Sequence, residues 1–274
     1  MHKLFVAYKP TGVSSNQFLG QLKRRYKIKK AGYSGTLDPF AKGVLIVALG
    51  NMTRLFRFLK KTPKTYRATL WLGAHSATLD TEQITRIDAL EELPLHQLKN
   101  ALRSLEGTLT YTPPDFSAKK INGKRAYALA REGYDVQLQP VTSTVHAITL
   151  IHYCHPFVTF EATVSEGTYI RSLGALLCER LQLAGGALSA LERLSEGKFR
   201  YNDEHFLNIK EYLDIPQNIF LGERDDMLLG KKLHVDQFRL HHESHYWVDL
   251  GNYLSIIKIE NSAVHYVLNK VAVC

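Results

Sequence analysis

The pattern of apolar and polar positions along the chain predicts a mixture of strands and helices. Stretches that are continuously apolar or alternate in polarity predict strands at 4–8, 44–49, 64–72, 141–153 and 157–164. The stretch 44–49 is apolar throughout and lies between two glycines, which is typical of a strand buried on both faces. The last two strands are expected to pair as a hairpin, with His155-Pro156 as the turn.

Apolar residues at helical spacing predict helices after Ser14 or Ser15, near 53–59, along 95–105, over 126–131 and after Thr168. Either serine can cap the first helix, and Thr168 is expected to cap the last one, which places Arg171 in its first turn. The leucines of 95–105 are expected in the core, whereas the polar and acidic stretch 78–93 is expected to be exposed.

The character of the sequence changes near residue 223, after which small residues are few and short apolar runs alternate with histidines. This change predicts a larger domain over 1–222 and a small β-rich module over 223–274. With 274 residues, 45% of them hydrophobic, the chain can bury a substantial core.

Positive charge is concentrated in the N-terminal quarter. The formal net charge is +9, and the first 79 residues contain fifteen Lys and Arg but a single acidic residue, Asp38. A second basic segment with interleaved aromatic residues covers 117–133. Clustered cations are typical of a surface that binds a polyanion such as nucleic acid, although a merely basic protein would have the same net charge.

Several classes of site lack support in the sequence. The three cysteines are widely spaced, so neither a disulfide framework nor a CxxC metal site is indicated, and a reducing compartment is expected. The stretch His241-His242-Glu243-Ser244-His245 has no evident further ligand, so no metal is expected there. Glycine-rich phosphate loops, a signal peptide and a bilayer-spanning run are not evident, and a cytoplasmic location is expected.

Asp38 lies in the sequence Ala31-Gly-Tyr-Ser-Gly-Thr-Leu-Asp38-Pro-Phe40. A single ionised carboxylate can act as a nucleophile when it faces an electrophile, and the surrounding cations are expected to keep its pKa low. Leu-Asp-Pro alone is also compatible with an ordinary turn that begins at Asp38.

The ordered motifs of residues 3–200 decide between these interpretations. They are Lys9-Pro-Thr-Gly-Val-Ser-Ser, the stretch around Asp38, Lys64-Thr-Tyr66-Arg-Ala, Ser117-Ala-Lys119-Lys-Ile-Asn-Gly-Lys-Arg-Ala-Tyr127, Ala130-Arg131, Gly167-Thr-Tyr169-Ile-Arg171 and Leu191-Glu-Arg-Leu194. Together they closely resemble the TruB family of tRNA pseudouridine synthases.

The resemblance implies an α+β pseudouridine synthase fold with a mixed, mainly antiparallel central sheet, followed by a PUA-like module. It implies conversion of uridine to pseudouridine at position 55, in the TΨC stem-loop of tRNA, by a monomer without a cofactor. Chemistry on a base requires that the base be flipped out of the stack. Asp38 would be the nucleophile, Arg171 its partner, and Tyr66 a residue that lies against the base and takes part in the final proton removal.

The resemblance also implies a set of RNA-binding residues, namely Lys9, Tyr33, Tyr66, Lys119, Arg131, Tyr169 and Leu191, with 117–133 closing over the RNA. The chain departs from the family at Tyr33, where a histidine is usual, so flipping with altered contacts is expected. The C-terminal module is short for a PUA domain. Two other functions remain open: a non-catalytic RNA-binding or RNA-folding protein, and a synthase acting on ribosomal or guide-directed RNA.

Overall fold

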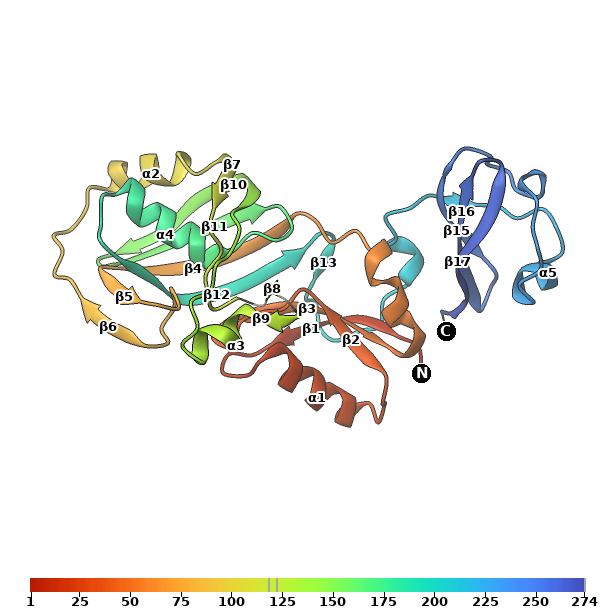
Figure 1. The fold of residues 1–274 in the computed structure, drawn as a ribbon, viewed down its shortest axis with the longest axis horizontal. Helices are drawn as coiled ribbons and strands as arrows, with labels where there is room; N and C mark the ends of the chain where they lie inside the picture. Colours follow the sequence, from red (N-terminus) through yellow and green to blue (C-terminus); the bar gives the residue numbers. More distant parts are fainter. Residues whose placement is uncertain (118, 122, 274) are drawn as a thin grey trace.

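A large sheet forms the main body of the protein in the computed structural model, which describes residues 1–117, 119–121 and 123–273 (Figure 1). Its strands are β1 (Leu4–Lys9), β2 (Ala31–Ser34), β3 (Lys42–Leu49), β4 (Lys64–Leu72), β7 (Gly107–Tyr111), β10 (Val141–Cys154), β11 (Phe157–Val164), β12 (Gly186–Glu196) and β13 (Phe199–Arg200). The hydrogen-bonded order is β1-β3-β12-β4-β11-β10-β7, with β2 paired to β3 and β13 paired to β12. Strands β3 and β12 run parallel, and the other described pairs of this sheet are antiparallel.

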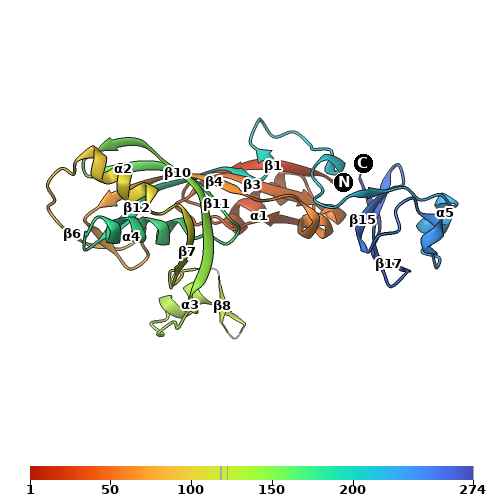
Figure 2. The ribbon, with the colours of Figure 1, turned by 90° about the horizontal axis from the view of Figure 1, so that it is seen from above.

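The remaining elements surround this sheet or follow it. The helices are α1 (Ser15–Arg25), η1 (Gly50–Phe58, a 3-10 helix), α2 (Leu95–Arg103), α3 (Ala126–Arg131), α4 (Ile170–Arg180), η2 (Ile209–Glu211), α5 (Arg224–Leu228) and η3 (Val235–Gln237). The small strands form two pairs, β5 (Ala74–Ser76) with β6 (Ile84–Ile87), and β8 (Lys120–Ile121) with β9 (Lys124–Arg125). The region of α3 and β8 projects away from the large sheet (Figure 2). Within the described residues, no helix is long and apolar enough to cross a bilayer.

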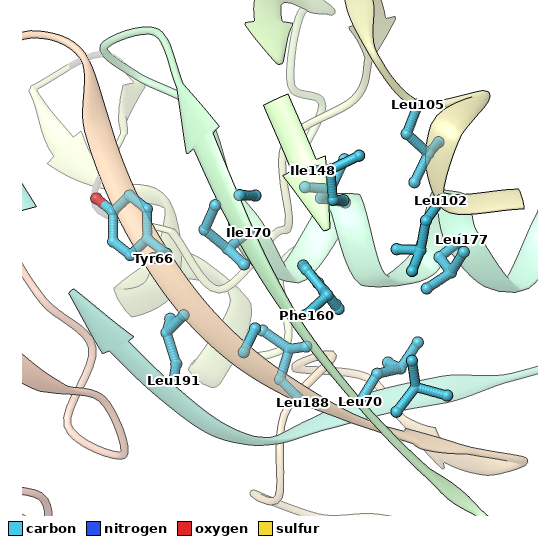
Figure 3. Close-up of a cluster of buried hydrophobic side chains, with 14 of the residues drawn as sticks. Tyr66, Leu70, Leu102, Leu105, Ile148, Phe160, Ile170, Leu177, Leu188 and Leu191 are labelled. Carbon is cyan, nitrogen blue, oxygen red and sulfur yellow. The ribbon is translucent and has the colours of Figure 1, made fainter. Parts of the chain in front are cut away.

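Two hydrophobic clusters cover the two faces of β3. Val44, Ile46 and Ala48 belong to one cluster, while Leu45 and Val47 pack in another with Phe18 and Leu22 of α1. The prediction of a strand buried on both faces is therefore confirmed. A third cluster lies under α2 and α4 and extends along β4, β11 and β12, where Tyr66 and Leu191 lie at its edge (Figure 3).

A second sheet lies at the C-terminal end of the molecule (Figure 1). Its order is β14 (Gln217–Asn218), β15 (Ser244–Asp249), β16 (Tyr253–Glu260) and β17 (Ala263–Ala272). Strand β14 precedes residue 223 and pairs with β15. Apolar residues of β15, β16 and β17 share a cluster with residues of β3 and η1, so the second sheet packs on the first part of the chain. The division at 222/223 and the PUA-like character of this module stay predictions.

Most of the predicted strands and helices are confirmed, including the hairpin of β10 and β11. Ser14 caps α1: its hydroxyl accepts a hydrogen bond from Gln17 N, and the Gln17 side chain accepts one from Ser14 N. The prediction that Thr168 caps α4 is wrong, because Tyr169 occupies the cap position and the Thr168 hydroxyl donates to the Ser165 carbonyl instead. Leu95 is exposed, unlike the other leucines of its stripe.

Candidate active site

The loop between β2 and β3 carries Asp38, and hydrogen bonds to its backbone hold it against the start of α1. The Ser15 hydroxyl donates to the Leu37 carbonyl at 3.0 Å and accepts from Leu37 N at 2.9 Å. Gly12 N donates to the Pro39 carbonyl at 2.8 Å. Because both sides of Asp38 are tied down in this way, the carboxylate is held in a defined position rather than on a free turn.

Lys9 supports the same loop from inside the protein. Its side chain is buried, and Nζ donates to the carbonyls of Pro10, Val13 and Pro39 at 2.9, 2.6 and 3.4 Å. Burial lowers the pKa of Lys9 to about 8, and the negative charge of Asp38 opposes this change. In the protein without RNA the Lys9 ammonium contacts the loop carbonyls, and its contact with RNA stays a prediction.

Arg171 connects the Asp38 loop with two other segments. Its Nε lies 3.0 Å from Asp38 Oδ2, and its side chain is 5% exposed. Nη1 donates to the Thr78 carbonyl and Nη2 to the Phe116 carbonyl, both at 2.8 Å. Since a planar guanidinium offers its donors in fixed directions, these contacts orient the nitrogen that meets Asp38.

Asp80 is a second carboxylate on the same guanidinium, and it was not predicted. Its Oδ2 lies 3.5 Å from Arg171 Nη1, and its Oδ1 accepts hydrogen bonds from the Thr78 hydroxyl at 2.6 Å and from Glu82 N at 2.9 Å. The prediction that 78–93 is exposed throughout is wrong, because Thr78 and Asp80 are buried. Leu79 and Asp80 contact Leu188 of β12 through the backbone, which brings this segment into the site. A signal was present in the sequence, since Asp38 and Asp80 both end a Thr-Leu-Asp tripeptide.

The pKa of Asp38 is raised, not lowered as predicted. Removal of the carboxyl group from water is the main cause, and the negative charges of Asp80 and Glu82 add to it. The positive charges of Arg171 and Lys9 act in the opposite direction but do not outweigh these effects. The many cations of the N-terminal quarter therefore do not set the protonation of this group.

A cavity of about 350 Å³ opens beside Asp38, a volume within the range of about 300–1,000 Å³ that is usual for ligand pockets. Tyr66 of β4, Tyr169 at the start of α4 and Leu191 of β12 line it together with Asp38 and Arg171. The Tyr66 hydroxyl points away from the leucines of the core (Figure 3). The cavity thus combines flat and apolar walls with the Asp38 carboxylate, as a site for chemistry on a planar base requires, and Glu166 adds a second carboxylate to its lining.

The chain matches, over residues 23–170, the model of the N-terminal domain of TruB family pseudouridylate synthases. It is 54% identical over 271 residues to tRNA pseudouridine synthase B of Sulfurimonas denitrificans, covering 99% of each chain. It is 50% identical over 274 residues to tRNA pseudouridine synthase B of Campylobacter jejuni (strain 81-176), covering 100% of each. The chain belongs to the TruB family of pseudouridylate synthases.

Solved structures similar to this TruB family member confirm the expected α+β fold. A chain of a Cbf5-Nop10-Gar1 complex aligns with a TM-score of 0.68 and 19% identity, covering 98% of this chain and 84% of the other. A chain of the archaeal box H/ACA sRNP Nop10-Cbf5 complex aligns with a TM-score of 0.65 and 20% identity, covering 98% and 85%. At this identity the likeness concerns the fold, whose mixed, mainly antiparallel sheet is observed here as well.

A second cavity of about 470 Å³ in this TruB family member is also lined by Asp38 and Arg171. Tyr33 lines it, and its hydroxyl donates to Asn16 Oδ1 at 3.0 Å. Arg131 of α3 also lines it, and its guanidinium lies 3.4 Å from Glu82 Oε2. Lys119 lines the first cavity instead, where its ammonium donates to the Gln139 carbonyl at 3.1 Å. The structure thus places six of the seven predicted RNA-binding residues along two cavities that share Asp38 and Arg171, whereas Lys9 lines neither of them.

The histidine-rich stretch of the C-terminal module does not form a cluster of ligands. His241 Nε2 lies 2.7 Å from the Phe238 carbonyl. In the part of the chain that the structure describes, no group of three or more His, Cys, Asp or Glu side chains is arranged to hold a metal ion.

Proposed function

We propose that this protein converts uridine to pseudouridine at position 55 in the TΨC loop of tRNA, with Asp38 as the nucleophile. The observation that supports it most directly is the pair of Asp38 and Arg171 at the wall of a cavity that Tyr66, Tyr169 and Leu191 also line. The names of the relatives support tRNA as the substrate.

The proposed reaction is an isomerisation and needs no cofactor. The bond between N1 of uracil and C1′ of ribose breaks, the base turns, and a bond forms between C5 and C1′. C5 then loses its proton and N1 gains one, so the atoms balance. The Asp38 carboxylate forms a transient covalent bond with the nucleotide and is released at the end, which is the way a carboxylate nucleophile divides one difficult step into two.

The neighbours of Asp38 have separate roles in this proposal. Arg171 holds the carboxylate in position through its fork of donors. Tyr66 lies against the flipped base and takes part in the removal of the C5 proton, while Tyr169 and Leu191 complete the walls of the pocket. Tyr33 and Arg131 contact the RNA outside this pocket, and Lys119 contacts it at the pocket wall. The enzyme acts as a monomer, and residues 117–133 close over the RNA.

The test uses purified protein and an unmodified tRNA transcript without added cofactor. The wild type should form pseudouridine, whereas Asp38→Asn should bind the transcript and form none. Turnover by Asp38→Asn would refute the nucleophile, and binding without turnover by the wild type would indicate a non-catalytic RNA-binding protein. Mapping pseudouridine across total RNA from cells with and without the protein should show loss at tRNA position 55. Loss only at ribosomal sites would refute the proposed substrate.

A further inference from the structure

Lys64 is a buried cation at the wall of the first cavity. It begins β4, two residues before Tyr66, and its side chain is 8% exposed. A Cβ atom added at Gly35, three residues before Asp38, would lie 3.1 Å from Lys64 Nζ, so the ammonium lies directly against the loop of the proposed nucleophile. Lys64 and Asp38 both line this cavity. The role proposed above for Asp38 does not use this cation.

The contacts of Lys64 leave its charge incompletely compensated. Its closest carboxylate is Glu196, the cross-strand neighbour on β12, at 3.4 Å. Glu196 also accepts a hydrogen bond from the Ser34 hydroxyl at 3.0 Å and lies 3.4 Å from Arg193 Nη2. Arg193 and Glu196 are almost fully buried, so two cations share one carboxylate inside the protein. A buried charge without a full partner is costly, and an anion that enters the cavity would be bound by it.

Glu166 is the other carboxylate near Lys64, and it is held loosely. Its Oε1 lies 3.9 Å from Lys64 Nζ, and its side chain is 57% exposed. Among the described residues, none accepts a side-chain hydrogen bond from Lys64, so the Glu166 contact is an ion pair without close geometry. Glu166 belongs to the short loop between β11 and α4 and can turn towards solvent.

We propose that Lys64 binds a backbone phosphate beside the target uridine, and that Glu166 occupies this position when RNA is absent. The proposal rests on the proposed function and adds a binding site to it. A base that reaches Asp38 brings the phosphates of its own nucleotide to the rim of the same cavity, because they are joined to its ribose. Lysine binds phosphate as a point charge, and phosphate contacts fix the register of a nucleic acid.

The test measures binding of a TΨC stem-loop RNA in which one phosphate next to the target uridine is replaced by a neutral methylphosphonate. Both neighbouring phosphates are tested, with Asp38→Asn as the common background so that no turnover occurs. One of the two replacements should weaken binding about tenfold, as loss of a charged contact does. In Lys64→Met the same replacement should change affinity less than about twofold, because the two changes remove one interaction. A plot of the logarithm of the RNA association constant against the logarithm of the salt concentration has a negative slope. In Lys64→Met this slope should be less steep by about 0.7.

Two further variants keep the test decisive if Lys64→Met folds poorly. Glu166→Gln should bind unmodified RNA about two- to fivefold more tightly, because it removes the competing carboxylate of a partly exposed ion pair. It should still lose affinity when the sensitive phosphate is replaced by a methylphosphonate. Arg67→Gln is the matched control, since Arg67 pairs with Glu161 on the opposite face of β4. Arg67→Gln should lose as much RNA affinity on methylphosphonate replacement as the background protein does.

Two results would overturn the proposal. One is that replacement of the sensitive phosphate weakens binding by folded Lys64→Met as much as it weakens binding by the background protein; the other is unchanged or weaker binding of unmodified RNA by Glu166→Gln. Lys64 would then only neutralise Glu196, and its loss would appear as lower thermal stability. Failure of the proposed function is seen separately, as absence of pseudouridine in the wild-type reaction, because the methylphosphonate comparison reads binding alone.

Discussion

Asp38 and Asp80 contact different nitrogens of one buried guanidinium, that of Arg171, at 3.0 and 3.5 Å. Asp80 also accepts hydrogen bonds from its own segment, whereas Asp38 faces a cavity. Asp80 therefore anchors the arginine on one side, and Asp38 is left with an oxygen available to a substrate.

Replacement of Arg171 by lysine should impair the reaction although the charge is retained. A lysine cannot reproduce the fork that joins Asp38 with the Thr78 and Phe116 carbonyls, so the carboxylate loses its fixed position. We expect the single-turnover rate of pseudouridine formation to fall about 100-fold, the usual effect of a displacement near 1 Å. Arg180→Lys, at the exposed end of the same helix, should retain the wild-type rate. An Arg171→Lys enzyme as fast as wild type would contradict the assigned role.

The pH dependence of the reaction should report the raised pKa of Asp38. The nucleophile must be ionised, so the rate should fall as the pH decreases through the raised pKa of Asp38. Glu82→Gln removes one of the charges that raise this pKa. In this variant the fall of the rate on the acidic side of the pH–rate profile, its acidic limb, should therefore occur at lower pH. Glu91→Gln, an exposed acid outside the site, should leave the limb in place. An acidic limb that moves to higher pH in Glu82→Gln would contradict this electrostatic account.

Asp38 should also lower the stability of the folded protein. Because its pKa is higher in the folded than in the unfolded chain, its contribution is most favourable below the unfolded pKa and is lost as the pH rises through the folded pKa. Asp38→Asn should therefore raise the thermal midpoint at pH 8, and the difference from wild type should shrink towards pH 4. Calorimetry of both proteins at the two pH values tests this. A larger gain at pH 4 than at pH 8 would contradict the direction of the pKa change.

Tyr66→Phe removes the hydroxyl of Tyr66 and keeps its ring, so it distinguishes a role in proton removal from a role in stacking. The ring is 8% exposed and packs at the edge of the core, so the variant should keep the wild-type thermal midpoint and RNA affinity. If the hydroxyl takes part in proton removal, the rate of product formation should fall about 10²- to 10⁴-fold. Wild-type turnover by Tyr66→Phe would assign Tyr66 to stacking alone.

Tyr33→His tests the position at which the sequence resemblance leads us to expect a histidine. In the present chain the Tyr33 hydroxyl is joined to Asn16 at the start of α1, so the ring has a fixed place in the second cavity. We expect the histidine variant to change tRNA affinity or turnover, measured on the same transcript. Unchanged values for both would show that Tyr33 has no special role in handling the RNA.

The sequence predicted the elements whose burial follows from local pattern. The apolar run of β3, the alternation of β4 and the Ser14 cap of α1 each depend on neighbouring residues, and all three are observed. The motifs around Asp38 and Arg171 predicted which residues would meet.

What the sequence did not predict depends on contacts between distant segments. Asp80 lies in a polar stretch and becomes buried only because its segment docks on β12. The raised pKa of Asp38 could not be obtained by counting cations, since desolvation and two distant carboxylates outweigh them. The partners of Lys64 likewise come from segments far from it in the chain, Glu196 from β12 and Glu166 from the loop after β11.

The parallel pairing of β3 with β12 has a consequence for synthesis of the protein on the ribosome. At this junction Gly43 has φ of +113°, and a Cβ there would lie 2.3 Å from the Arg193 carbonyl. Arg193 donates to the Gly35 carbonyl across 158 residues of sequence. The Asp38 loop is therefore among the first parts of the chain to emerge, and it can contact Lys9 and Ser15 early but Arg193 only late. A nascent chain that ends before β12 can already contain Arg171, but it lacks the Arg193 contact to the Gly35 carbonyl, so the support from β12 is the last that the loop acquires.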